Sequence, residues 1–308
     1  TYTNVATNEI KTRLGHTNLI IVSTIHDMLW EQIKGYSSTE LVAIHKLRLE
    51  SEYKQLSCKI EELVRDNSKL RDCLTEDIFQ ELFSEEARDK YFCILTKHTK
   101  AKSFKKAYLK EFGEKHGYLD QAITGNFGNF KKFMGWSFSK SDLKSAIERI
   151  DSQESLEDGD KQINKIRIQY DSKSNKDRLA SMKFSHDTLI DYSLELFKKF
   201  PILQKIFIDK YPYLFIDEYQ DTNPKVIELV ELLQKYYKEK QSDNQFLWMV
   251  GFFGDHYQNI YGDGKSIGDK LFEEEKDSDN YKVISKKYNR RSSKTVINIC
   301  NNIRANPD

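Results

Sequence analysis

The sequence has few cysteines, and none of them lies close to another. The four are Cys58, Cys73, Cys93 and Cys300, with no Cys-x-x-Cys pair among them. Zinc ribbons and disulfide frameworks need cysteines at short spacings, so the composition argues against both classes of site. Separate cysteines suit a reducing compartment, and we therefore expect a cytoplasmic protein.

Long apolar runs and an excess of charge of one sign are also missing. The chain has no run of about eighteen apolar residues and no N-terminal signal pattern, so we expect no membrane partner. Its 49 lysines and arginines nearly balance 48 aspartates and glutamates, which leaves a net charge of +1. Such a balance creates no global field that would attract nucleic acid, and any basic surface must be local. No repeat with a period of about 20–50 residues is visible.

The chain does contain short apolar runs near both of its ends. They are Leu19–Val22, Tyr213–Ile216 and Phe246–Phe253, and each is predicted to be a buried strand. Helical patterns alternate with them over residues 6–14, 28–33, 184–200 and 293–303, and after Pro224. This alternation is typical of α/β proteins with a parallel sheet, and 308 residues are enough for about two domains.

Acidic residues directly follow the second of these runs. Asp217 and Glu218 come at its end, and Asp221 follows three residues later. Open α/β sheets bind their ligands at the carboxyl ends of the strands. Paired carboxylates there suit a Mg²⁺-nucleotide site, in which one holds the metal and the other orients the attacking water. A plain strand-to-loop junction with solvated acids is the alternative that these residues leave open.

Residues 39 to about 183 break the alternation. Apolar side chains there follow a heptad seam, with Asn67 at the remaining seam position: Leu49, Tyr53, Leu56, Ile60, Leu63 and Leu70. The seam predicts a long amphipathic helix, and packing in a helical domain is favoured over a dimerising coiled coil because only about three heptads support it. The glycine-rich aromatic stretch Phe127–Phe138 is predicted to be loop and core, and Asp151–Asp160 an exposed acidic loop.

A local basic stretch occupies residues 97–118. Its cationic side chains are Lys97, His98, Lys100, Lys102, Lys105, Lys106, Lys110, Lys115 and His116. Phe104, Tyr108 and Phe112 recur every four residues, so they share one helix face and are predicted to be core. The lysines opposite form either a solvated face or a patch that contacts nucleic-acid phosphates, and the sequence leaves both interpretations open.

Five short polar segments follow one another along the chain in a specific order. They are Thr1-Tyr-Thr-Asn-Val-Ala6, Thr24-Ile-His26, Asp217-Glu-Tyr-Gln-Asp-Thr222, Gly254-Asp-His-Tyr-Gln-Asn-Ile-Tyr-Gly262 and Asn289-Arg-Arg-Ser292. They resemble motifs Ia, Ib, II, III and IV of the UvrD/Rep/PcrA family of superfamily 1 helicases, and the third segment matches almost letter for letter. The segment Phe184–Leu189 resembles the stretch that precedes motif II in that family.

The resemblance implies an α/β fold with a RecA-like P-loop NTPase parallel sheet and an inserted helical subdomain. Lobe 1A would comprise residues 1–30 and 184–281, and the second lobe, 2A, would start within 282–308. Residues 31–183 correspond only by position to the inserted subdomain 1B. ATP and Mg²⁺ are the implied cofactors, and single-stranded DNA or a tailed duplex is the implied partner.

The family also implies a role for each matched residue. Asp217 would hold Mg²⁺, Glu218 would activate the hydrolytic water, and Gln258 would sense the γ-phosphate of ATP. Arg291 would act as an arginine finger, and Arg290 stands where the family places a tyrosine that stacks on adenine. Contacts to single-stranded DNA would come from Tyr2, Thr3, Asn4, Thr24, His26 and Tyr261.

Two departures limit what the resemblance implies. Gly262-Asp-Gly-Lys265 replaces the family's aromatic continuation of motif III, which puts one base-stacking contact in doubt. The phosphate-loop pattern Gly-x-x-x-x-Gly-Lys-Ser/Thr is not found either, since Gly264-Lys-Ser266 has Asn259 at the first glycine position. We therefore expect the chain alone not to hydrolyse ATP, and we expect the loop in flanking parts of a larger protein.

Three functions follow from these patterns. The first is a DNA-dependent ATPase and helicase or translocase that moves 3′-to-5′. The second is a helicase-like subunit that senses nucleotide or DNA for a partner nuclease, as in bacterial anti-phage systems such as Gabija. The third, an interaction module without ATP chemistry, is disfavoured by Asp217, Glu218, Gln258 and Arg291.

Overall fold

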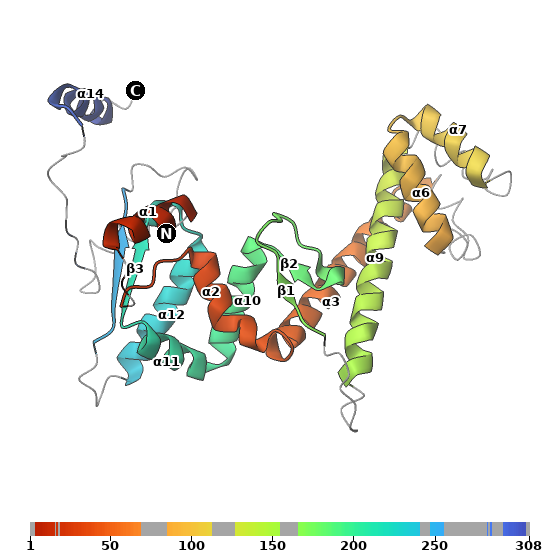
Figure 1. Ribbon diagram of the computed structural model, residues 1–308. Helices are drawn as coiled ribbons and strands as arrows, with labels where there is room; N and C mark the ends of the chain where they lie inside the picture. Colours follow the sequence, from red (N-terminus) through yellow and green to blue (C-terminus); the bar gives the residue numbers. More distant parts are fainter. Residues whose placement is uncertain are drawn as a thin grey trace.

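The chain folds into an α/β lobe and a long helical extension (Figure 1). This computed structural model describes residues 4–15, 17, 19–68, 85–112, 127–154, 166–240, 247–255, 282, 284 and 292–305. Helices dominate these residues, and the strands form two small parallel sheets, which confirms the α/β class. None of the helices described combines the length and the apolar character needed to cross a lipid bilayer.

The lobe is built around two parallel strands, β3 (Tyr213–Asp217) and β4 (Met249–Phe253). Their register is continuous from the first residue of each strand to the last, where Asp217 lies opposite Phe253. Both strands therefore end at the same edge, as the sequence predicted for parallel strands. The helix that connects them, α12 (Pro224–Lys240), completes a strand–helix–strand unit.

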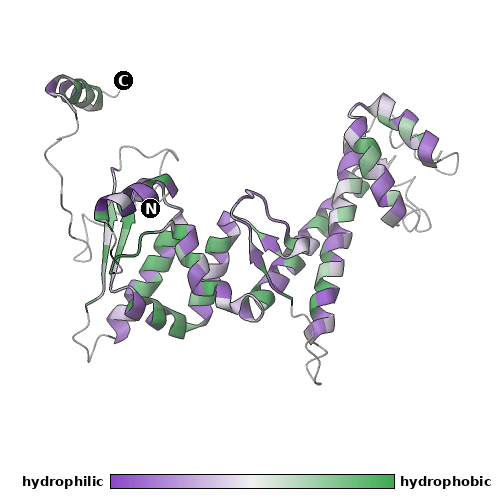
Figure 2. Ribbon diagram, viewed as in Figure 1, coloured by the Kyte–Doolittle hydropathy of each residue, from purple (hydrophilic) through white to green (hydrophobic). Residues whose placement is uncertain are grey.

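Five of the described helices share one apolar core with Ile216 of β3. They are α2 (Ile25–Ile33), α10 (His186–Lys199), α11 (Pro201–Lys210), α12 and the start of α3 (Glu40–Arg65). Their apolar stripes are visible in Figure 2. Each large apolar side chain that is fully buried in such a core contributes roughly 1.5–3 kcal/mol. Helix α12 begins as predicted: Asn223 Oδ1 accepts a hydrogen bond from the Lys225 amide at 3.0 Å, and Pro224 occupies the first turn.

Strand β3 is buried on one face only, so the prediction of a fully buried strand was wrong. Ile216 is buried and Leu214 is half-buried, whereas Tyr213 and Phe215 are each 56% exposed. Alternate side chains of a strand point to opposite faces, and the helices described here cover only the face of Ile216. The apolar run in the sequence is typical of a strand that is covered on both faces, but the described helices cover only one face of β3.

The predicted strand Leu19–Val22 is not a strand in the structure, and the prediction of burial was also wrong. Leu19 is 94% exposed and Ile21 is 65% exposed, and the segment joins no described sheet. A strand requires hydrogen bonds to a neighbour, and β3 pairs only with β4 among the residues described. Helix α2 then begins at Ile25, because Thr24 Oγ1 accepts a hydrogen bond from the Asp27 amide at 3.1 Å.

The helix predicted from the heptad seam is confirmed as part of α3, and it packs within the chain. Helix α3 (Glu40–Arg65) lies along α9 (Phe127–Glu154), and α6 (Glu85–Lys97) and α7 (Ala101–Phe112) cover the far end of α9. Leu49 packs against residues of α9, as expected for a helical domain.

Residues 127–138 lie in helix α9, so the prediction of a loop there was wrong, although the prediction of core holds. Phe130, Phe133 and Phe138 are buried against α6 and α7. Their spacing of three to five residues places them on one helix face. Gly128 and Gly135 misled the prediction, because a helix tolerates glycine at a cost of roughly 1 kcal/mol when packing compensates.

A short parallel pair joins the extension to the lobe. Strand β1 (Gln169–Tyr170) pairs with β2 (Lys183–Phe184), directly before α10. The remaining helices are α1 (Asn4–Leu14), which ends at Gly15 with φ +71°, and α14 (Lys294–Ala305), which lies apart from the lobe in Figure 1. Both helices agree with the sequence prediction.

Candidate active site

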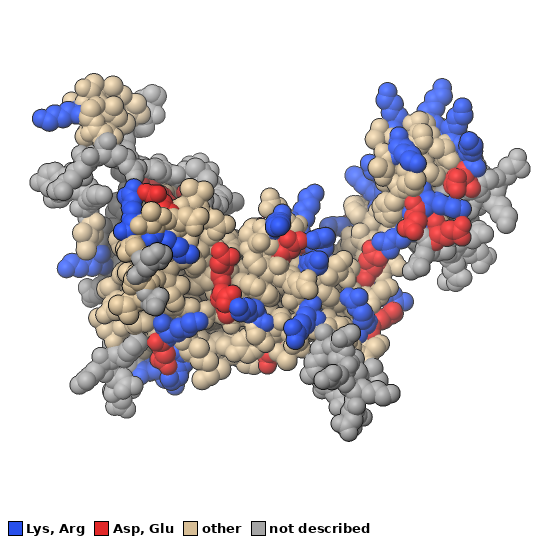
Figure 3. Space-filling model, viewed as in Figure 1, with Lys and Arg blue, Asp and Glu red and all other residues tan. Residues whose placement is uncertain are grey.

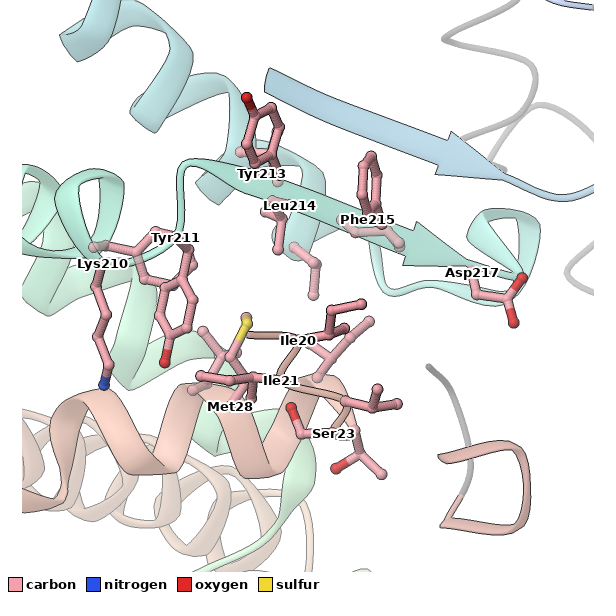
Figure 4. Close-up of a pocket in the computed structure, with 18 of the residues that line it drawn as sticks. Ile20, Ile21, Ser23, Met28, Lys210, Tyr211, Tyr213, Leu214, Phe215 and Asp217 are labelled. Atoms are coloured by element: carbon pink, nitrogen blue, oxygen red, sulfur yellow. The ribbon is translucent and has the colours of Figure 1, made fainter. Parts of the chain in front are cut away.

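The predicted acidic pair lies at the carboxyl end of β3. Asp217 is the last residue of the strand (Figure 4), and Glu218 follows it in the left-handed backbone region, at φ +52° and ψ +48°. A non-glycine residue in that region costs of order 1 kcal/mol or more and is enriched at functional sites. The turn therefore places Glu218 abruptly off the strand axis, and its side chain is exposed.

A buried glutamine links this turn to the end of β4. Gln220 is 2% exposed, and its Nε2 donates a hydrogen bond to Glu218 Oε2 at 2.6 Å. Its Oε1 accepts a hydrogen bond from the Asp255 amide at 3.2 Å. The two strand ends are thus joined through one side-chain amide. The sequence analysis assigned no role to Gln220, because only the folded chain brings Asp255 close to it.

A third carboxylate lies beside the pair in an unusual environment. Asp221 Oδ1 is buried without a hydrogen-bond partner among the described residues. Burial raises the pKa of Asp221, and the negative charge of Glu218 raises it further. A buried carboxylate oxygen without a donor, next to a second carboxylate, is a group that a cation would stabilise.

The three acids are better suited to a Mg²⁺ ion that is also bound by a nucleotide than to one bound by protein ligands alone. Among the described residues no three metal-binding side chains converge on one point. Mg²⁺ is usually bound through one or two carboxylates, with substrate phosphates and water completing its octahedron. Asp217 and Glu218 at a strand end, with the unsatisfied Asp221 beside them, supply that kind of partial ligand set.

The motif Ib residues form a second cluster around two histidines. The rings of His26 and His186 lie 4.4 Å apart, and Tyr170 Oη is 2.5 Å from His186 Nδ1. Burial lowers the pKa of His26, and the neighbouring His186 lowers it further against the opposing charges of Asp187 and Asp27. Neutral His26 is therefore favoured, and burial also raises the pKa of Tyr170 to about 12. Motif resemblance pointed to His26, but no sequence pattern singled out its neighbour His186 or Tyr170, which is bonded to His186.

An apolar pocket of about 640 Å³ lies next to Asp217. It lies between residues 19–25 and β3 and contains Thr24 and Asp217 in its lining (Figure 4). Asp217 and Lys210 are the only charged residues of the lining. An apolar pocket does not suit a triphosphate, so we place the candidate nucleotide chemistry at the outer strand edge instead.

The remaining predicted site residues lie outside the described part of the chain. These are Tyr2, Thr3, Gln258, Tyr261, Arg290 and Arg291. Asn4 is described: it is exposed, as the first residue of α1. The structure therefore places Asp217 and Glu218 at the end of β3 and brings Asp221 close enough to Glu218 for their charges to interact, and it leaves the predicted partners on the nucleotide as predictions.

Comparison with known proteins identifies what the chain resembles as a whole. The sequence profile of the UvrD/REP helicase N-terminal domain matches residues 1–277. Gabija protein GajB of Bacillus cereus (strain HuB5-5) is 39% identical over 307 residues, which are 99% of this chain and 41% of that protein. The ATP-dependent DNA helicase PcrA of Staphylococcus aureus (strain Mu50) is 33% identical over 117 residues, which are 38% of this chain and 15% of that protein. No solved structure gives a significant match. These matches confirm the family resemblance, and the chain spans less than half the length of both relatives.

Proposed function

The chain belongs to the UvrD/REP helicase N-terminal domain family, and on that premise we propose that its protein is a DNA-dependent ATPase that moves along single-stranded DNA. The observation that carries the proposal is the acidic pair Asp217–Glu218 at the carboxyl edge of two parallel strands, where the left-handed turn exposes Glu218. A RecA-like arrangement of lobe 1A with an inserted 1B-like subdomain over residues 31–183 accompanies this proposal, as does a cytoplasmic location.

Each matched residue has a distinct part in the proposed hydrolysis, and only Asp217 and Glu218 among them belong to the described part of the chain. Asp217 would hold Mg²⁺, and the metal would supply charge neutralisation for the phosphates of ATP. Glu218 accepts the proton of the attacking water through its carboxylate. Gln258 contacts the γ-phosphate, Arg291 stabilises the transferred phosphoryl group, and Arg290 stacks on the base.

Contacts to single-stranded DNA complete the motor. They come from Tyr2, Thr3, Asn4, Thr24, His26 and Tyr261, and movement is 3′-to-5′. Neutral His26 suits this role as a hydrogen-bonding and stacking group rather than as a fixed cation. The Thr24 hydroxyl accepts the cap hydrogen bond from the Asp27 amide, and its O–H remains a donor that suits a phosphate oxygen.

A second candidate function is a helicase-like subunit in anti-phage defence with a nuclease partner. The observation that favours it is the extent of the match: similarity to a Gabija protein covers nearly the whole chain, whereas similarity to PcrA covers about a third. In this case the same site hydrolyses or senses ATP, and the readout is nuclease activity rather than unwinding.

The substitution Glu218→Gln tests the ATPase proposal in the whole protein. We expect single-strand-stimulated ATP hydrolysis to fall by about 10²-fold or more while ATP and DNA binding persist, because only the proton acceptor is lost. Glu228→Gln on α12 is the matched control, since Glu228 forms an exposed ion pair with Lys198 of α10. Retention of the wild-type rate in Glu218→Gln would exclude the proposal.

A further inference from the structure

The side chain of Gln220 is buried and forms hydrogen bonds to residues that follow both strands. Its amide nitrogen donates to Glu218 Oε2 at 2.6 Å and its amide oxygen accepts from the backbone of Asp255 at 3.2 Å. The residue is 2% exposed, although the carboxylate that it binds belongs to an exposed side chain. A buried amide thus fixes one oxygen of a solvent-facing acid.

The backbone around Gln220 is shaped to admit this amide. A Cβ atom on Gly254 would lie 2.1 Å from Gln220 Oε1 and 2.8 Å from Tyr219 Cδ1, distances that real Cβ atoms do not adopt. The left-handed conformation of Glu218 turns its side chain back toward residue 220. Two unusual backbone features, one in each strand-end loop, therefore meet at the same amide group.

We propose that Gln220 is a positioning residue, which orients the Glu218 carboxylate and ties that orientation to the segment following β4. With Oε2 held by the Gln220 amide, Oε1 of Glu218 remains free to accept the proton of a water molecule. Without the amide, the exposed side chain of Glu218 would populate several rotamers, and only some of them would face the water. The inference rests on the proposed role of Glu218 as the proton acceptor.

The hydrogen bond to Asp255 extends the consequence to β4. A shift of the Gly254–Asp255 backbone would move Gln220 Oε1, and with it the amide nitrogen that holds Glu218. The readiness of Glu218 for proton transfer is therefore coupled to the position of the Gly254–Asp255 backbone. Such a coupling lets one strand-end loop control catalysis at the other.

The test replaces Gln220 in the whole protein and separates kcat from KM for single-strand-stimulated ATP hydrolysis. We expect Gln220→Met to lower kcat by about tenfold or more and to change KM for ATP by less than about threefold, because orientation and not nucleotide binding is lost. Gln220→Glu preserves an acceptor for the Asp255 amide but removes the donor to Glu218, so it should lower kcat similarly. Gln204→Met is the matched control, since Gln204 is also buried and its Nε2 donates to the Phe197 carbonyl, at 2.7 Å, rather than to an acid.

A double variant shows whether Gln220 acts through Glu218. Adding Gln220→Met to Glu218→Gln should lower the residual single-turnover rate by no more than about twofold, because the group being positioned is already gone. An equal loss in both backgrounds, or a wild-type kcat in both Gln220 variants, would overturn the inference. A wild-type rate in Glu218→Gln alone would instead overturn the proposed function, so the two failures are distinguishable.

Discussion

Gly254 is a position where neighbouring side chains leave no room for any residue other than glycine. The space where its side chain would stand is filled by Gln220 and Tyr219. Gly135 in α9 is a contrasting glycine, because a Cβ there would meet nothing within 4 Å. The two positions therefore allow the same substitution to be compared at a crowded site and at an open one.

We expect Gly254→Ala to lower the ATPase rate and Gly135→Ala to raise the stability of the protein. In Gly254→Ala the new methyl group displaces the Gln220 amide, and the ATPase rate should fall by about tenfold. In Gly135→Ala the stability of the protein should rise by roughly 0.5–1 kcal/mol, because alanine favours the helix interior. Steady-state kinetics and urea denaturation measure the two outcomes; a Gly254→Ala protein with full activity would contradict the expected close approach.

His45 predicts a dependence of stability on pH. The residue is fully buried, with Nδ1 2.7 Å from Tyr192 Oη and Nε2 2.9 Å from the Leu179 carbonyl. Burial lowers the pKa of His45, although the Leu179 carbonyl and Asp177 oppose the shift. The unfolded chain then binds a proton more readily than the folded one, so stability is complete above about pH 6.5 and falls as the pH drops through the lower folded-state value.

His45→Gln tests this linkage. At about pH 7.5 the variant should be less stable by about 1–3 kcal/mol, since the buried Tyr192 hydroxyl and Leu179 carbonyl lose partners. Between about pH 7 and pH 5 its urea midpoint should fall less steeply than that of the wild type, because one buried histidine no longer titrates. His26, whose pKa is also lowered, leaves part of the slope in place. Parallel pH profiles for the two proteins would refute the assignment.

Helices and strands that are determined by residues within their own segment could be predicted from the sequence. Those that require contact with a segment distant in the sequence could not. The caps of α2 and α12 lie within a few residues of their helices, and both helices were predicted. Residues 19–22 have the composition of a strand, but pairing is a property of the neighbour and not of the segment. Gln220 was equally invisible, because its contact with Asp255 spans two strands.

The exposed face of α7 is the element whose function the sequence left open. Phe104 and Tyr108 are buried, and Lys102, Lys106 and Lys110 lie exposed on the opposite side. Figure 3 shows lysine and arginine side chains gathered at this end of the extension. Residues 97–112 contain six lysines and one glutamate, hence a net charge of 6 − 1 = +5 in a chain whose total is +1. Such a local concentration favours a phosphate-binding surface over a merely solvated helix.

Charge reversal at these three lysines should weaken DNA binding and its dependence on salt. We expect the slope of log affinity against log salt concentration to decrease by about 0.7–0.9 for each lost phosphate contact. The control reverses Lys205, Lys235 and Lys240, which lie exposed on the lobe and carry the same charge. An unchanged slope in the α7 variant, or equal changes in both variants, would identify the α7 lysines as a solvated face.

At the scale of the whole molecule, one apolar pocket of the lobe is bordered by a residue from the acidic turn and by a residue next to His26. Asp217 and Thr24 both line that pocket, and His26 contacts His186 of α10, directly after β2. A change at the strand ends therefore has a short path to the segment that the family uses for DNA contacts. The extension is reached through the same region, because α3 and the β1–β2 pair both connect to it. This arrangement suits a motor in which hydrolysis displaces bound DNA.

The whole protein should therefore unwind a duplex with a 3′ single-stranded tail in an ATP-dependent reaction and leave a duplex with a 5′ tail intact. The polarity follows from the proposed 3′-to-5′ movement, and the requirement for ATP follows from the acids at the strand edge. A strand-displacement assay with each tailed duplex measures both, and Glu218→Gln supplies a control that binds DNA without turnover. Unwinding of both duplexes would contradict the polarity. Single-strand-stimulated ATP hydrolysis without unwinding of either duplex would favour the partner-dependent function, because the site would then be active while its work requires a second protein.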